Sequence, residues 1–142
     1  MNTENSYVID TSVAVKWFNR QDESYIEQAD KLLRDSQLDK VSLIMPELAK
    51  YEIGNALLNK RMPLANTLNS LATCYSIPIH FIPQDRKQAQ SAMQIAFDEK
   101  LTFYDASFMA LAKELDAHLI TDNPKHQKRK VKGLKVINLE DY

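Results

Sequence analysis

Four acidic residues of the chain occupy positions where a charge is unexpected. Asp10 follows the apolar run YVI, and Asp122 follows the run HLIT. Glu52 and Asp105 lie on or beside the apolar face of helix-like segments, with hydrophobic residues three and four positions away. A buried charge costs free energy unless it is paired, protonated or bound to a metal ion. These carboxylates are therefore candidates for a shared site.

Each of these acids also has a local, structural explanation. Asp10 precedes a helix-like segment and could simply cap it, and Thr102 with Asp105 matches a capping box. Glu52 could hold its carboxylate in water at the margin of the apolar face. The functional interpretation rests on the set, since two carboxylates ~5 Å apart repel by about 3 kcal/mol at an effective dielectric constant of 20. Convergence would require a cation or shifted protonation, and oxygen ligands favour Mg²⁺ or Mn²⁺ over zinc.

Other kinds of catalytic site find less support in the sequence. His80, His118 and His126 have no zinc-site spacing, and Cys74 is the only cysteine, so we expect no zinc centre. The chain has only two glycines, which excludes the glycine-rich phosphate loops of nucleotide-binding proteins.

The segments that must position the acids alternate between short apolar runs and longer runs of helical periodicity. We expect strands at 7–10, 41–46, 77–83, 118–123 and 134–139, and helices at 12–18, 24–37, 47–60, 64–76, 84–100 and 104–117. Thr11 or Ser12 is available to cap the first helix. This alternation predicts a three-layer α/β/α domain around a mostly parallel sheet of about five strands. Asp10 and Asp122 would then share the edge where the strands end.

Composition sets broader limits on the protein. Its 142 residues are expected to form one domain, residues 1–142, and the net charge of −1 gives no global attraction to nucleic acid. We expect a cytoplasmic protein, because there is a single cysteine, no basic leader and no apolar run of membrane-spanning length.

Three segments carry a family resemblance: VIDTSVAVKWF, PELAKYEIGNAL and LTFYDASFMALAKELDAHLITDN. In this order and at these separations they resemble PIN domains, and most closely the VapC-type toxin ribonucleases of toxin–antitoxin modules. The resemblance extends from Tyr7 to about Leu139. It implies hydrolysis of RNA phosphodiester bonds with Mg²⁺ or Mn²⁺, leaving a 5′-phosphate. It also implies a cognate antitoxin and a homodimer, and the helices within 25–33 and 55–72 are the candidate dimer contacts.

The resemblance also implies roles for individual residues. Asp10, Glu52 and Asp105 match the first three acidic positions of the family, which hold the metal ion and carry catalysis. The usual fourth acid falls on Asn123, and Asp122 beside it could take over that role. The supporting polar residues are expected to be Thr11, Ser12, Asn55, Thr121 and Asn123.

Binding of RNA requires positive surface, because phosphate contacts dominate affinity. Residues 125–135 contain six basic residues and no acid, directly after an expected strand end. The segment is either a solvated loop or an RNA contact. The candidate RNA contacts are Lys16, Lys125, Lys128, Arg129 and Lys130.

The sequence bears on two alternatives to a nuclease. A phosphoryl-transfer enzyme with Asp10 as nucleophile would be expected to have a second acid two residues later, and Ser12 at that position argues against it. A degenerate PIN domain that binds RNA or protein without catalysis is kept open by Asn123 at the usual acid position.

Overall fold

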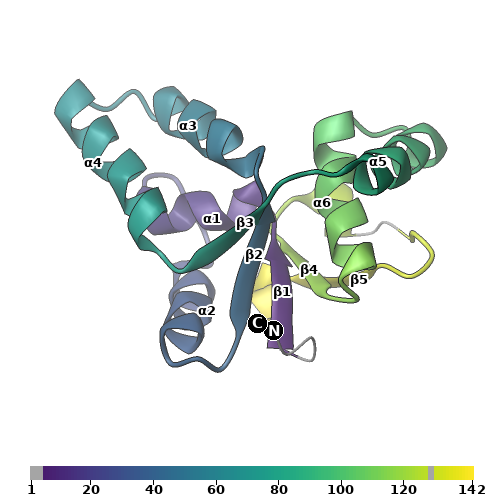
Figure 1. Cartoon of the computed structure of the whole chain (residues 1–142). Helices are drawn as coiled ribbons and strands as arrows, with labels where there is room; N and C mark the ends of the chain where they lie inside the picture. The colour runs from purple at the N-terminus through teal and green to yellow at the C-terminus, as the bar shows by residue number, and fades with distance from the viewer. Residues whose placement is uncertain (1–4, 128–129) are drawn as a thin grey trace.

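A parallel five-stranded sheet organises the protein (Figure 1). The structure, a computed structural model, describes residues 5–127 and 130–142. The strands are β1 (Ser6–Ile9), β2 (Ser42–Pro46), β3 (Ile79–Ile82), β4 (His118–Thr121) and β5 (Lys135–Asn138). Their order across the sheet is β3-β2-β1-β4-β5, and every neighbouring pair is parallel. The predicted parallel sheet of about five strands is therefore confirmed.

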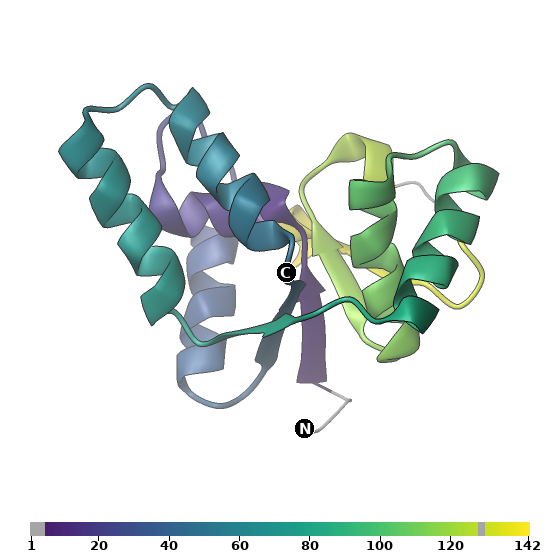
Figure 2. The same ribbon diagram turned by 45° about the horizontal axis from the view of Figure 1, so that its top comes forward.

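Helices cover the sheet on both sides. The structure contains α1 (Thr11–Phe18), α2 (Ile26–Gln37), α3 (Ala49–Asn59), α4 (Leu64–Ser76), α5 (Arg86–Glu99), α6 (Phe103–Glu114), α7 (Pro124–Gln127) and the 3-10 helix η2 (Leu139–Asp141). Figures 1 and 2 show α1 to α4 on one side of the sheet and α5 and α6 on the other, which confirms the three-layer prediction. No helix in the described part of the chain is long and apolar enough to cross a membrane.

The central strands determine where the acidic residues meet. Apolar side chains of β1 and β4, such as Val8, Ile9 and Ile120, are fully buried, as expected for a parallel sheet covered on both faces. Ile9 pairs with Ile120 in the sheet, and the backbone N–H of Asp10 donates to the carbonyl of Ile120 at 2.9 Å. The residues that follow β1 and β4 therefore lie side by side at one edge.

The prediction that Thr11 or Ser12 caps the first helix is wrong. Helix α1 begins at Thr11 and its cap position is Asp10, and no side chain in the described part of the chain caps its first turn. The two hydroxyl groups bind carboxylates instead, as described below. The other predicted cap is confirmed, because the Thr102 hydroxyl accepts a hydrogen bond from the Asp105 backbone N–H at 3.1 Å.

Candidate functional site

Asp10 lies at the buried centre of the candidate site and is only 5% exposed. Its Oδ2 atom accepts hydrogen bonds from the hydroxyl groups of Ser12 and Thr121, both at 2.8 Å. Ser12 belongs to the first turn of α1 and Thr121 ends β4, so donors from two elements hold the carboxylate. These predicted supporting residues thus contact the predicted acid directly.

Glu52 and Asp105 approach Asp10 from the helices on the two sides of the sheet. Thr11 Oγ1 donates to Glu52 Oε1 at 2.9 Å, which connects α1 to α3. Burial raises the pKa of Glu52, and the negative charges of Asp10 and Asp105 raise it further. The three acids that sequence analysis assigned to one site therefore interact electrostatically.

His126 is a member of the site that sequence analysis did not assign. Its side chain is 2% exposed, with Nδ1 3.4 Å from Asp10 Oδ2 and Nε2 3.3 Å from Asp105 Oδ2. Burial alone would lower the pKa of His126, but the hydrogen-bonding capacity and charge of the two aspartates raise it to about 9. The neighbouring imidazole in turn lowers the pKa of Asp105.

A local sequence signal could have placed His126. Asn followed by Pro is typical of a helix start, since Asn is a good cap and Pro suits the first helical position. In the structure Asn123 caps α7: its Oδ1 accepts from the Lys125 backbone N–H at 3.0 Å, and its carbonyl accepts from the His126 N–H at 2.9 Å. This single turn brings the imidazole to the sheet edge.

The carboxylate of Asp122 is engaged by a lysine. Lys16 Nζ lies 2.9 Å from Asp122 Oδ2 and 3.2 Å from Glu23 Oε1, and it donates to the Ser24 carbonyl at 2.8 Å. Lys16 is 2% exposed. An RNA contact needs an accessible ammonium group, so the predicted contact by Lys16 does not fit its burial.

A cleft of about 490 Å³ opens beside Glu52. Two exposed aromatic side chains line it, Tyr51 at 78% exposure and Tyr104 at 62%. The other lining residues are Thr11, Glu52, Asn55, Ala56 and Asn59. The predicted supporting residue Asn55 is therefore exposed and lines the cleft. It does not belong to the buried hydrogen bonds described around Asp10.

The remaining predicted RNA contacts lie after β4. Lys125 is exposed on α7, and its charge contributes to the lowered pKa of Asp105, which places it close to the acids. Lys130 is also exposed, whereas Lys128 and Arg129 lie outside the described residues.

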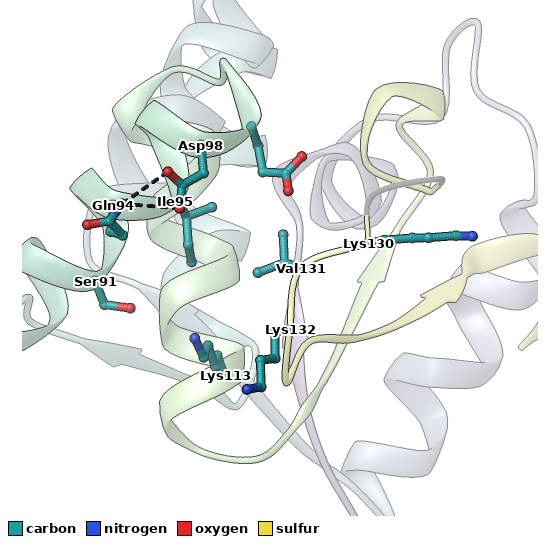
Figure 3. A pocket seen from close by; sticks show the side chains of 9 residues that line it. Ser91, Gln94, Ile95, Asp98, Lys113, Lys130, Val131 and Lys132 are labelled. Carbon is teal, nitrogen blue, oxygen red and sulfur yellow. Dashed lines mark hydrogen bonds between the residues drawn. The ribbon is translucent and has the colours of Figure 1, made fainter.

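A second pocket, of about 280 Å³, lies between α5, α6 and residues 130–132 (Figure 3). Its charged lining is mixed, with Lys113 and Lys132 opposed by Asp98 and Glu99. Figure 3 shows Lys130 extending away from the other labelled side chains. Since none of the four candidate acids lines it, this pocket is separate from the acidic site.

The donor atoms of the acidic site suit a divalent cation. Within residues 5–127 and 130–142, no three His, Cys, Asp or Glu side chains already surround a metal position. The site nevertheless brings together the carboxylates of Asp10, Glu52 and Asp105, together with His126 Nε2, a buried nitrogen that makes no hydrogen bond to the described residues. Clustered carboxylates and an unsatisfied buried nitrogen are the groups that a cation would stabilise.

Comparison with known proteins identifies the family. The protein is thus an α/β/α domain with a group of acidic residues at the carboxyl edge of its parallel sheet. The family model of the PIN domain matches residues 7–132, and the chain therefore belongs to the PIN domain family. No curated protein shows significant sequence similarity to the chain.

Several solved structures share the fold. A chain of VapBC2 from Rickettsia felis, bound to a promoter DNA fragment, has a TM-score of 0.68 at 18% identity, covering 94% of this chain and 98% of that one. PAE2754 from Pyrobaculum aerophilum has a TM-score of 0.65 at 25% identity, and the match covers 95% of this chain and 90% of PAE2754. VapC20 from Mycobacterium tuberculosis is described as a sarcin-ricin loop cleaving toxin. It has a TM-score of 0.64 at 15% identity, and the match covers 89% of this chain and 97% of VapC20.

The raised pKa of His126 predicts how stability depends on pH in the metal-free protein. A group whose pKa is higher in the folded state contributes stability that is complete below its unfolded pKa and lost as pH rises. The contribution of His126 should thus be present below pH 6.5 and disappear as pH rises through about 9. Urea unfolding in a chelator should show the stability difference between wild type and His126→Gln shrinking over that interval. A difference that stays constant with pH would contradict the ion pairs.

Proposed function

We propose that the protein is a divalent-metal-dependent endoribonuclease of the cytoplasm, and the toxin of a toxin–antitoxin pair. The observation that carries the proposal is the meeting of Asp10, Glu52 and Asp105 at the carboxyl edge of the sheet. Membership of the PIN domain family supports the nuclease assignment. The structural neighbours described as VapBC complexes support the toxin assignment and a cognate antitoxin as partner.

The surrounding residues would hold the acids ready for the reaction. Ser12 and Thr121 fix the Asp10 carboxylate, and Thr11 fixes Glu52, so little rearrangement is needed to present oxygen ligands. A Mg²⁺ or Mn²⁺ ion bound there would supply Lewis-acid stabilisation of the phosphate and a water activated for attack. The Asp105 side chain, 31% exposed, keeps the site open to a phosphodiester from solution.

The cleft beside Glu52 favours unpaired RNA as substrate. Bases in single strands and loops stack on exposed aromatic side chains, whereas duplex bases are already stacked on one another. Tyr51 and Tyr104 are largely exposed and line the cleft that contains Glu52. Lys125, exposed near Asp105, could contact a phosphate of the same strand.

One observation favours a non-catalytic PIN domain as the second candidate. The imidazole of His126 lies between Asp10 and Asp105, and in this arrangement it balances part of their charge without a metal ion. Such a protein could bind RNA or a protein partner through the cleft and leave the phosphodiester bonds intact.

A direct assay separates these two functions. Purified wild type should cleave RNA containing unpaired segments in Mg²⁺ or Mn²⁺, and EDTA should abolish cleavage. Asp10→Asn and Glu52→Gln each remove a ligand charge and should reduce the rate by roughly 100-fold or more. Asp39→Asn, which alters an exposed acid outside the site, should retain the wild-type rate. Equal cleavage by all four proteins, or none with any cation, would exclude the nuclease.

The aromatic cleft gives a second prediction, on binding. Loss of one stacking partner costs about 1–3 kcal/mol per base, so Tyr51→Ala and Tyr104→Ala should each weaken binding of a single-stranded oligonucleotide roughly 5- to 150-fold. Tyr75→Ala, which removes an aromatic side chain of 65% exposure outside the cleft, is the matched control. Fluorescence anisotropy measures the affinities. An unchanged affinity in both cleft variants would remove the stacking role.

The homodimer proposal rests on exposed leucines along α3 and α4. Leu58 is 69% exposed, Leu64 is 72% and Leu68 is 53%. The other candidate helix, α2, has no exposed large hydrophobic side chain within Ile26–Gln37. We therefore place the contact with a second copy of the chain on α3 and α4.

Sedimentation equilibrium tests this contact. Replacing Leu64 and Leu68 together by Glu should shift a dimer to the monomer, because charged side chains are disfavoured at the core of an interface. Leu38→Glu changes a leucine of 61% exposure that lies outside α3 and α4, and should leave the dimer intact. A monomeric wild type, or a double variant that remains dimeric, would refute the placement.

A further inference from the structure

The Nε2 atom of His126 is buried in the acidic site, close to a carboxylate but without a hydrogen bond among the described residues. The residue is 1% exposed, and Nε2 makes no hydrogen bond within the described part of the chain. The nearest charged group is Asp105, whose Oδ2 lies 3.3 Å away without hydrogen-bond geometry. Buried polar atoms in native proteins almost always have a partner, so this nitrogen calls for a ligand.

The other ring nitrogen is oriented by Asp10. His126 Nδ1 lies 3.4 Å from Asp10 Oδ2, and that oxygen is itself fixed by Ser12 and Thr121. Histidines that bind metal ions usually direct their second nitrogen to a carboxylate, which fixes the tautomer and the ring orientation. The contact with Asp10 leaves Nε2 as the nitrogen that points toward Asp105.

The distance between Nε2 and Asp105 suits two ligands of one ion. Donors that each lie about 2.1 Å from a shared cation are separated by about 3.0–3.4 Å at octahedral or tetrahedral angles. The observed 3.3 Å falls within this interval.

Two other polar residues after β4, Asp122 and Asn123, have partners of their own. Asp122 pairs with the buried Lys16 at 2.9 Å, and Asn123 caps α7 through its side-chain oxygen. His126, in contrast, lies between Asp10 and Asp105.

We propose that His126 Nε2 is a direct ligand of the catalytic cation, together with Asp105, and that the mixed nitrogen–oxygen site selects Mn²⁺ over Mg²⁺. The inference deepens the proposed nuclease function and rests on it. Mg²⁺ prefers oxygen ligands alone, whereas imidazole binds transition-metal ions more favourably. The competing interpretation is that the imidazole only balances the charges of the two aspartates, in which case no metal–nitrogen bond forms.

Pulsed electron paramagnetic resonance of the Mn²⁺-loaded protein distinguishes the two interpretations without measuring activity. Wild type should show a ¹⁴N coupling of the size produced by a directly bound imidazole. His126→Asp should still bind Mn²⁺ through an oxygen and should lose that coupling. His80→Gln changes an exposed histidine of β3 and should retain it. Bound Mn²⁺ without nitrogen coupling in wild type, or with the same coupling in His126→Asp, overturns the inference.

Metal affinities provide the second readout. The ratio of Mn²⁺ to Mg²⁺ affinity, from calorimetric titration, should fall about 10-fold or more in His126→Asp relative to wild type. If His126→Asp has the same ratio of Mn²⁺ to Mg²⁺ affinity as wild type, His126 does not select Mn²⁺. If wild type cleaves RNA with Mn²⁺ but shows no nitrogen coupling, only the ligand role of His126 fails. If it neither binds Mn²⁺ nor cleaves RNA, the proposed function fails with it.

Discussion

The negative charge of Asp10 is buried at the end of the central strand, where solvent cannot screen it. Side chains from three segments of the chain contact its carboxylate. Two hydroxyl groups donate to one carboxylate oxygen, and an imidazole approaches the same oxygen at 3.4 Å. A buried carboxylate without such partners would cost several kcal/mol. The helix start at Thr11, the end of β4 and the short turn of α7 are therefore coupled through Asp10.

The charges at this edge separate into two groups. Lys16 pairs with Asp122 and Glu23 at the side of α1. Asp10 and Asp105 contact His126, and the charge of His126 also acts on Glu52. When all three acids are ionised and the imidazole is protonated, two negative charges remain uncompensated. Burial raises the pKa of Glu52, and the charges of Asp10 and Asp105 raise it further. A divalent cation has the charge that such a group lacks.

The sequence predicted the elements whose signal is local. Periodicity located the strands and main helices within a few residues, and the parallel topology then placed Asp10 and Asp122 at one edge. The acids on helix faces were recognisable because a carboxylate interrupts an apolar pattern. The resemblance to PIN domains assigned Asp10, Glu52 and Asp105 to the first three acidic positions of the family. The match of the PIN domain model over residues 7–132 agrees with that resemblance.

The features that sequence analysis missed depend on contacts between distant segments. Ser12 stands at the start of a helix, and this position alone predicts a cap. In the structure its hydroxyl group donates to Asp10 Oδ2 instead. Lys16 appeared to be a surface cation, since its burial depends on Asp122, more than a hundred residues away in the chain. His126 lacked metal-site spacing because its partners are Asp10, which follows β1, and Asp105 of α6. Only the helix start at Asn123 and Pro124 indicated the turn that carries it to the site.

The central claim is that the buried charge of Asp10 organises a cation site, and a crystal structure of the wild-type protein soaked in Mn²⁺ tests it most directly. Anomalous scattering would locate the ion independently of the protein model. The account predicts a manganese peak at the carboxyl edge of the sheet, within coordination distance of the acid group and of His126 Nε2. A structure in which Mn²⁺ binds elsewhere, while the imidazole still lies between Asp10 and Asp105, would contradict it.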